Sequence, residues 1–389
     1  MEDFVIKYRK ELLENVIPFW EKYSIDKEYG GYLTCLDRDG SVFDTDKFMW
    51  LQGRQIWTMS MLYDKVEAKE HWKEIAEHGA RFILQHGRDE KGDWYFALDR
   101  AGNPLVQPYN IFSDCFASMG LAALYKITNN DEYAQVAYDT FKRIIQRRNN
   151  PKGKYNKAYP NTRALKGFSL PMILSNLSLE LEHIVGTDTV ESLIDEIIHE
   201  VMEVFYQPES GLIVESVNAD GTFSDTFEGR LVSPGHVIEA MWFMMDLAAR
   251  RKDAKLMDKC IQIALRALEY GWDEEFGGIF YFKDILNRPP QQLEWDQKLW
   301  WVHLEALVCM AKGYAYTGDE RCKAWFEKLD NYAFNRFSDP QYGEWFGYLN
   351  RQGQPLLTLK GGKWKGCFHV PRALFKIYES LETTVLQGI

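Results

Sequence analysis

DEEFGGIFYFKD, residues 273–284, is one of five similar segments from which the predicted fold follows. Each segment begins with an acidic or polar residue and runs through a Gly into alternating apolar and aromatic residues, usually up to a second turn such as Asp-Gly. Alternation between glycine-containing turns is typical of a short β-hairpin, so we name them the hairpin segments. The other four are DKEYGGYLTCLDRDG (26–40), DEKGDWYFALDRAG (89–102), QPESGLIVESVNADG (207–221) and DPQYGEWFGYLNRQG (339–353).

The hairpin segments recur with a period of roughly 60 residues, except for one gap of about twice that length. NNPKGKYNKAYPNTR (149–163) lies near the middle of this gap and keeps the Gly and Tyr pattern without the acidic start. We count it as a degenerate member, which gives six repeats. A period of this length indicates an array or a closed ring of repeats.

Two kinds of helix alternate between the hairpin segments. The helix before each segment is amphipathic, as in 131–148 and 322–337, which is typical of a helix with one face in water. The helix after each segment is apolar on nearly all sides, as in 231–249 and 296–316, and must be buried. This alternation predicts an all-α (α/α)6 barrel of six helix-pair repeats with short β-hairpins at one end. We expect residues 1–389 to form a single domain.

Composition narrows the classes of partner. The formal net charge of −11 argues against nucleic acid or an anionic membrane as the main partner, because both need a basic face. Residues 1–20 carry charges throughout and read as an amphipathic helix, not as a signal peptide, and no apolar run is long enough to span a bilayer. The six cysteines show neither CxxC pairs nor His partners at metal-ligand spacing. We therefore expect reduced thiols in a cytoplasmic protein that acts on a small molecule.

Polar and charged residues recur where the apolar helices begin. In a barrel of this kind these helix starts meet at one end, so their side chains should converge on a shared pocket. Arg54, Glu239, Glu305 and Arg372 lie inside otherwise apolar helices. Because an unpaired buried charge costs several kcal/mol, these four must pair with one another or line a wet cavity.

Two histidines occupy matching helix starts in the fourth and sixth repeats. His236 follows Ser233, the expected N-cap, and Pro234, the expected first helical residue. His369 lies just before Pro371, which we expect at the first position of its own helix. The positive end of a helix disfavours imidazolium, so we expect both histidines to be largely neutral near pH 7. Their positions would let them approach one substrate from different sides. The alternative for each is a hydrogen-bonded structural role.

Three other chemistries compete with this interpretation. A metal could use His236 and Glu239, but no third His or Cys recurs at a matching spacing, so we expect no metal. Cys367, beside Lys365 and close to His369, could be a nucleophile if its pKa is lowered. Glycoside hydrolysis would need two carboxylates as acid and base. The available carboxylates are Asp114, Glu228, Glu239, Asp296 and Glu305.

The segment KGGKWKG (360–366) is a candidate for phosphate binding. It lacks the Walker spacing and a preceding parallel strand. Backbone N–H groups and lysines could still hold phosphates, and the alternative is a glycine-rich turn with solvated lysines. The residues of this predicted nucleotide site are Lys360, Gly361, Gly362, Lys363 and Lys365.

Five motifs resemble those of the N-acylglucosamine 2-epimerases, the family that includes the mammalian renin-binding protein. The resemblance runs in order from the first repeat to the sixth and so covers essentially the full chain. The motifs are WLQGRQIW (50–57), SPGHVIEAMW (233–242), QLEWDQKLWW (292–301), YGEWFGYLNR (342–351) and KGGKWKGCFHVPR (360–372).

The resemblance implies a reaction and the residues that perform it. Members of the family interconvert N-acetyl-D-glucosamine and N-acetyl-D-mannosamine at C2 of the ring-opened sugar, through an enediolate. His236 and His369 match the two essential histidines of the family, which remove and return the C2 proton on opposite faces. Arg54 matches its essential arginine, suited to hold the developing negative oxygen. Glu305 matches an essential glutamate that could orient a histidine or bind a sugar hydroxyl.

The resemblance extends to binding residues, effectors and assembly. Trp301 and Trp364 resemble sugar-stacking aromatics, and Glu239 and Arg372 are expected to bind substrate or support residues that do. The family needs no metal or nicotinamide, ATP activates many members allosterically, and members are commonly homodimers. The alternatives are an aldose–ketose isomerase or cellobiose-type 2-epimerase on the same barrel, and a non-enzymatic regulatory protein of the renin-binding kind.

Overall fold

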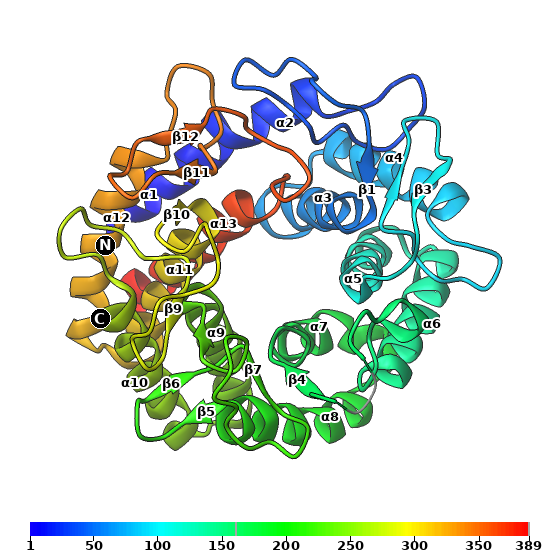
Figure 1. Cartoon of the computed structure of the whole chain (residues 1–389). Helices are drawn as coiled ribbons and strands as arrows, with labels where there is room; N and C mark the ends of the chain where they lie inside the picture. Colours follow the sequence, from blue (N-terminus) through cyan, green and yellow to red (C-terminus); the bar gives the residue numbers. More distant parts are fainter. Residues whose placement is uncertain (160–161, 388–389) are drawn as a thin grey trace.

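The computed structural model describes residues 1–159 and 162–387, and its helices form two concentric rings (Figure 1). Six helices surround the axis and the others pack outside them, as the (α/α)6 barrel prediction requires. The inner helices are α3 (Met49–Met61), α5 (Ile111–Thr128), α7 (Ser169–Val185), α9 (Pro234–Arg251), α11 (Trp300–Thr317) and α13 (His369–Gln387). The outer ring holds α1 (Glu2–Lys10), η1 (Glu11–Val16), α2 (Ile17–Tyr23), η2 (Leu62–Val66), α4 (Glu70–His86), α6 (Asp131–Arg147), α8 (Thr187–His199), η4 (Glu200–Val204), α10 (Ala254–Gly271) and α12 (Glu320–Arg336).

The burial of each ring follows from its sequence pattern. On α11 every residue from Trp300 to Tyr314 is buried, because the helix is apolar on all sides and has neighbours on all sides. On α6 the buried residues form a single stripe, and the charged residues of the helix lie outside it. That stripe consists of Tyr133, Ala137, Thr140, Phe141 and Ile144.

Short strands join neighbouring repeats at the end of the barrel where the inner helices begin. The strand that leads into an inner helix pairs with a strand from the hairpin of the next repeat: β1 with β2, β4 with β7, β8 with β9 and β10 with β11. The strands are β1 (Lys47–Phe48), β2 (Ala97–Leu98), β3 (Pro104–Val106), β4 (Leu165–Gly167), β5 (Tyr206–Gln207), β6 (Leu212–Ile213), β7 (Ser216–Asn218), β8 (Leu231–Val232), β9 (Lys283–Asp284), β10 (Lys298–Leu299), β11 (Tyr348–Leu349) and β12 (Pro355–Leu357).

The sixth repeat meets the first through a backbone contact of the same kind. The N–H groups of Lys360 and Gly361 donate to the carbonyl of Leu36 at 2.9 and 3.2 Å. Helix α1 also packs against α13. These contacts close the ring.

The degenerate third segment is not a hairpin in the part that the structure describes. Residues 153–155 form a short 3-10 turn, and residues 160–161 lie outside the described residues. Strand β4, which follows this segment and leads into α7, still pairs with β7 of the fourth hairpin segment, as the other entry strands do with the next repeat. The loss of the acidic start and of strict alternation explains why this segment does not pair with itself.

Three buried aspartates hold neighbouring hairpins together. Asp26 accepts hydrogen bonds from the Lys47 ammonium at 2.9 Å and from both forks of the Arg100 guanidinium at 3.0 Å. The lysine follows the hairpin of the aspartate, and the arginine comes from the turn of a neighbouring hairpin. The same arrangement recurs twice, so we name the three sets the inter-repeat triads. The other two are Asp273 with Lys298 and Arg351, and Asp339 with Lys360 and Arg38.

Among the helices described, none has the length and apolar character needed to cross a membrane.

Candidate active site

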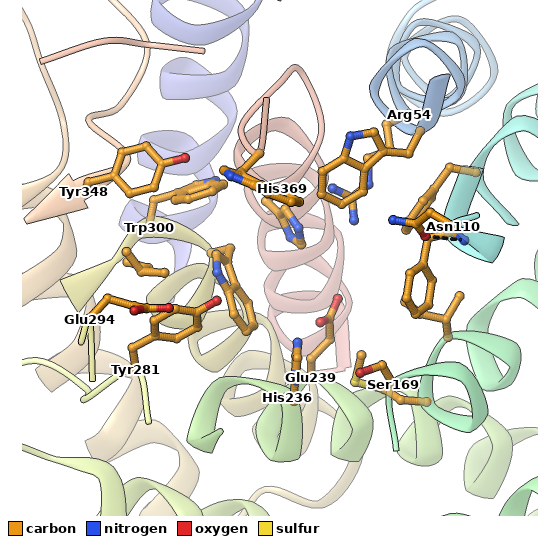
Figure 2. Close-up of a pocket in the computed structure, with 18 of the residues that line it drawn as sticks. Arg54, Asn110, Ser169, His236, Glu239, Tyr281, Glu294, Trp300, Tyr348 and His369 are labelled. Carbon is orange, nitrogen blue, oxygen red and sulfur yellow. Dashed lines mark hydrogen bonds between the residues drawn. The ribbon is translucent and has the colours of Figure 1, made fainter. Parts of the chain in front are cut away.

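A cavity of about 570 Å³ lies at the end of the barrel where the inner helices begin. Each of the six inner helices contributes a side chain from its first two turns or its cap (Figure 2). One such residue per helix is Arg54 of α3, Asn110 before α5, Ser169 of α7, His236 of α9, Trp301 of α11 and His369 of α13.

His369 is held as a neutral imidazole. Its Nδ1 lies 2.7 Å from Oε1 of Glu305, and because a carboxylate only accepts, Nδ1 carries the proton. Burial lowers the pKa of His369 well below its usual value, and the charges of Arg54 and Arg372 lower it further. The other ring nitrogen, Nε2, therefore keeps its lone pair and can take a proton from a molecule in the pocket.

His236 differs from the expectation that both histidines are neutral. Burial acts to lower the pKa of His236, but the negative charge of Glu215 and its hydrogen bond to the ring outweigh burial, and the pKa is raised. Nδ1 of His236 lies 3.0 Å from Oε1 of Glu215. The helix start is nonetheless as predicted, since Ser233 caps it and accepts a hydrogen bond from the His236 N–H at 3.4 Å. A carboxylate partner overrides the helix dipole here.

Trp301 lies against both histidines. Its ring centroid is 5.0 Å from that of His236 and 6.0 Å from that of His369. The indole thus offers a flat apolar surface beside the two histidines, which suits the carbon–hydrogen face of a sugar. Trp364, predicted for the same role, also lines the pocket but is half exposed at its rim and contacts Trp50 edge to face.

Arg54 is a buried cation without an anionic partner among the described residues. Its guanidinium carbon lies 3.9 Å from the ring centroid of Phe116 and 4.6 Å from that of Trp50, and its Nε has no hydrogen-bond acceptor in the described chain. Burial lowers the pKa of Arg54 to about 9, with a further contribution from Arg372. The side chain stays protonated at neutral pH and can receive a negative oxygen in the pocket.

Glu305, Glu239 and Arg372 form a buried ion network next to His369. One guanidinium nitrogen of Arg372 donates to Oε1 of Glu239 at 2.6 Å and to Oε1 of Glu305 at 2.7 Å. Trp242 donates to the other oxygen of Glu305 at 2.9 Å. Glu239 lines the pocket, whereas Glu305 and Arg372 lie behind it. Glu305 therefore contacts His369 and is not among the residues that line the pocket.

The same network bears on metal binding. Ligand atoms of Glu239, Glu305 and His369 lie within 4.8 Å of one another, which is close enough to hold an ion. Arg372 already bonds both carboxylates, so its positive charge occupies the position that a cation would need. The donor set is thus neutralised by the protein itself.

The predicted nucleotide segment is engaged in internal contacts. The ammonium group of Lys365 donates to Glu344 at 2.7 Å, and that of Lys360 pairs with Asp339 at 2.9 Å in an inter-repeat triad, with both side chains fully buried. The backbone N–H groups of Gly361 and Gly362 donate to Leu36 and to Lys365. Lys360, Gly361, Gly362 and Lys365 are therefore not free to bind phosphate, which corrects the prediction for these four. Lys363 is exposed, and its ammonium group lies 5.0 Å from the ring centroid of Trp364 and 5.4 Å from that of Phe96.

The residues expected for a nucleophilic or a glycosidase reaction are buried, paired or outside the pocket. Cys367 is buried, and burial raises the pKa of its thiol well above the usual value, so it is not an activated nucleophile. Glu228 is exposed and Asp114 pairs with Arg147 at 2.9 Å, and neither lines the pocket. Asp296 does not line it either. The two remaining candidate carboxylates, Glu239 and Glu305, are both bonded to Arg372.

Sequence reasoning missed several residues of the site. Glu215, which contacts His236 but does not line the pocket, is the most informative, because the only signal was one charge inside the alternating segment LIVES of the fourth hairpin (212–216). The others come from a helix cap, from hairpins of the later repeats and from the stretch between β9 and β10, where no local pattern marks a residue as facing the axis. They are Asn110, Tyr281, Glu294, Gln297 and Tyr348.

Comparisons with known proteins place the fold and site in context. The rat N-acylglucosamine 2-epimerase (Rattus norvegicus) is 39% identical over 370 residues, which cover 93% of this chain and 88% of the rat protein. The structure of a cellobiose 2-epimerase from Bacillus thermoamylovorans superposes with a TM-score of 0.85 at 24% identity, covering 97% of this chain and 100% of that one. A D-mannose isomerase superposes with a TM-score of 0.82 at 16% identity and covers 98% of both chains.

The two structural neighbours establish the barrel fold, which they share with this chain. The sequence comparison is more specific, since the rat enzyme and this chain align over most of both proteins. The profile described as N-acylglucosamine 2-epimerase (GlcNAc 2-epimerase) matches residues 31–373, a span that contains every pocket residue named above. This chain belongs to the N-acylglucosamine 2-epimerase family of carbohydrate isomerases.

Proposed function

We propose that this protein interconverts N-acetyl-D-glucosamine and N-acetyl-D-mannosamine by moving the proton on C2. One observation carries the proposal: two histidines with opposite pKa shifts, His369 lowered and His236 raised, lie on one pocket and against one tryptophan. Epimerisation needs a base on one face of C2 and an acid on the other, and such a pair provides both at the same pH.

The reaction uses the open-chain sugar, in which C2 is next to the C1 aldehyde. Nε2 of His369 takes the C2 proton, and the electrons of that bond form a C1–C2 double bond and place a negative charge on O1. In an N-acyl sugar the enediolate is thus an enolate. Arg54 stabilises O1, a contact worth about 2.7–4 kcal/mol in comparable oxyanion sites. His236 then donates its proton to the opposite face of C2, and each transfer contributes roughly 10²–10⁴ in rate.

One turnover exchanges the protonation states of the two histidines. His369 ends as the acid and His236 as the base, which is the state that the reverse reaction needs. A second turnover in the same direction requires proton exchange with solvent. Solvent hydrogen should therefore accumulate at C2 of both epimers.

The test is proton NMR of the purified protein with N-acetylmannosamine in D₂O. We expect the anomeric signals of N-acetylglucosamine to grow and C2 of product and recovered substrate to become deuterated. Conversion without deuterium would exclude the deprotonation mechanism. No conversion would overturn the proposed function. Substituting His236 or His369 by Ala should abolish conversion, whereas a purely regulatory protein would keep its partner binding in both variants.

The second candidate is 2-epimerisation or aldose–ketose isomerisation of unacylated sugars. The fold match to a cellobiose 2-epimerase and a D-mannose isomerase favours it, because both superpose over nearly the whole chain. Mannose, glucose and cellobiose, tested in the same NMR experiment, distinguish this candidate from the first.

The resemblance to the family supports three further proposals: ATP acts as an allosteric activator, the protein is a homodimer, and it is cytoplasmic. Repeating the NMR assay with and without ATP tests the first. Light scattering of the purified protein tests the second, and fractionation of the source cells tests the third. Because Lys360 and Lys365 are buried in ion pairs, we place any ATP site elsewhere.

A further inference from the structure

The active-site pocket has two chemically different walls on either side of the histidines (Figure 2). One wall carries phenol, carboxylate and amide groups from Tyr281, Glu294, Gln297 and Tyr348. The other comes from the starts of α5 and α7 and is mainly apolar; we name it the α5–α7 wall. It consists of Asn110, Phe112, Phe116, Ser169, Met172 and Ile173.

Within this wall, Asn110 presents a hydrogen-bond donor of fixed direction to the pocket. It is the N-cap of α5, and its Oδ1 accepts a hydrogen bond from the Phe112 N–H at 2.9 Å. The cap fixes which end of the amide is oxygen, so the Nδ2 group is the end that is left over. No described residue accepts a hydrogen bond from this Nδ2. Ser169 on the first turn of α7 adds a hydroxyl without a hydrogen-bond partner among the described residues.

We infer that the α5–α7 wall binds the N-acyl group of the amino sugar, with Asn110 donating to the acyl carbonyl. This inference rests on the proposed function. Ser169 accepts from the amide N–H, and Met172 and Ile173 contact the acyl methyl group. An amide with a methyl group needs one donor, one acceptor and an apolar surface, and the wall offers these three together.

The opposite wall suits the remainder of the substrate. The open-chain sugar carries hydroxyls from C3 to C6, and each loses hydrogen bonds to water on entering the pocket. The Tyr, Glu and Gln side chains of that wall can replace those bonds, whereas the α5–α7 wall has too few polar groups to do so. An acyl group placed against the Tyr, Glu and Gln side chains instead would leave their polar atoms unpaired.

The first experiment removes the donor and keeps the helix cap. Asn110→Asp and Asn110→Ser both retain an oxygen that can cap α5, and the Ser variant adds no charge. The matched control is Asn130→Asp, because Asn130 caps α6 through the same bond, to the Glu132 N–H at 3.0 Å, on the exposed outer ring. We expect kcat/KM for N-acetylmannosamine to fall roughly tenfold to a hundredfold in both Asn110 variants, mainly through KM, and to stay unchanged in the control.

The outcomes separate this inference from the proposed function. A wild-type protein that does not convert N-acetylmannosamine overturns the proposed function. An active wild type with both Asn110 variants equal to the Asn130 control leaves the function standing and overturns the acyl site. Thermal unfolding of all variants checks that the capped helices are intact.

The second experiment measures which wall limits the size of the acyl group. Met172→Ala enlarges the α5–α7 wall, and Leu299→Ala enlarges the pocket next to Tyr348, with which Leu299 pairs between β10 and β11. Both variants are compared on N-acetyl-, N-propanoyl- and N-butanoylmannosamine. We expect Met172→Ala alone to raise kcat/KM for the longer acyl groups relative to acetyl. The same shift in Leu299→Ala instead would place the acyl group on the opposite wall and overturn the inference.

Discussion

At the scale of single residues, burial and the neighbouring charges set the pKa of each histidine, and burial with Arg54 and Arg372 lowers that of His369. Glu305 is itself neutralised by Arg372, so it orients His369 without adding much negative charge to its surroundings. Glu215 raises the pKa of His236 through its charge and its hydrogen bond, against the effect of burial. The two histidines therefore differ in the charges around them: Arg54 and Arg372 act on His369, and Glu215 acts on His236.

Replacing Glu215 by Gln should lower the pKa of His236, because the hydrogen bond stays possible while the charge is lost. The two histidines together need one proton, so activity is lost as pH rises through the pKa of His236, which Glu215 raises. We expect the alkaline limb of kcat/KM to move to lower pH, equally in both reaction directions, with turnover at pH 8 reduced roughly tenfold or more.

The control is Glu203→Gln, since Glu203 lies 2.8 Å from Nδ1 of the exposed His199 in a comparable pair far from the pocket. Its pH profile should match that of the wild type. An alkaline limb that does not move in Glu215→Gln would show that His236 is not the acid.

At the scale of helices, the position of Arg54 depends on how closely α3 and α5 approach. A Cβ on Gly53 would lie 2.3 Å from the Phe116 carbonyl oxygen, and one on Gly120 would lie 2.4 Å from the Gly53 carbonyl oxygen. The two backbones thus touch through glycines, and the next residue, Arg54, is laid against the Phe116 ring.

Gly53→Ala should push α3 and α5 apart. We expect a loss of at least roughly 1–3 kcal/mol in unfolding free energy from overpacking, together with lower kcat as Arg54 moves. Denaturant unfolding and the NMR assay measure the two effects. Gly167→Ala is the control, because its Cβ would meet no heavy atom within 4 Å. Equal stability of the two variants would contradict the close approach.

The helix scale also shows how far the sequence could predict the structure. The two rings and the convergence of inner-helix starts follow from periodicity within each repeat, so His236, His369 and Arg54 could be found. Glu215 and Asn110 could not be found in this way. The contact of Glu215 with His236 depends on pairing between repeats, and the orientation of Asn110 depends on the geometry of a helix cap. Lys360 and Lys365 were misread for the same reason: their acidic partners lie in other segments of the chain, and no local pattern reveals the pairing.

At the scale of the whole molecule, the inter-repeat triads connect the hairpins around the ring. The Asp339 triad is special because its arginine, Arg38, comes from the first repeat and its aspartate from the sixth. Burial alone would raise the pKa of Asp339, but hydrogen bonds from Arg38 and Lys360 lower it to about 2. The pKa of Asp273 is likewise lowered to about 2, against burial, by Arg351 and Lys298.

Replacing Arg38 by Gln should therefore destabilise the closed ring in a pH-dependent way. An aspartate with a lowered folded pKa stabilises the fold above its unfolded pKa of about 3.9, and this contribution disappears as pH falls through the folded value. We expect Arg38→Gln to melt below the wild type at pH 7, consistent with a loss of about 1.5–3 kcal/mol, and the difference to shrink as pH falls from about 4 towards 2.

Arg351→Gln, whose guanidinium is similarly exposed, is the comparison for a triad that does not join the chain's two ends. A melting difference that persists unchanged at low pH would mean that Arg38 contributes by packing on Tyr342 and Phe346 and not through the charge of Asp339. If Arg38→Gln loses more than Arg351→Gln, the joint between the first and sixth repeats is the one on which the barrel depends, because opening it frees both ends of the chain at once.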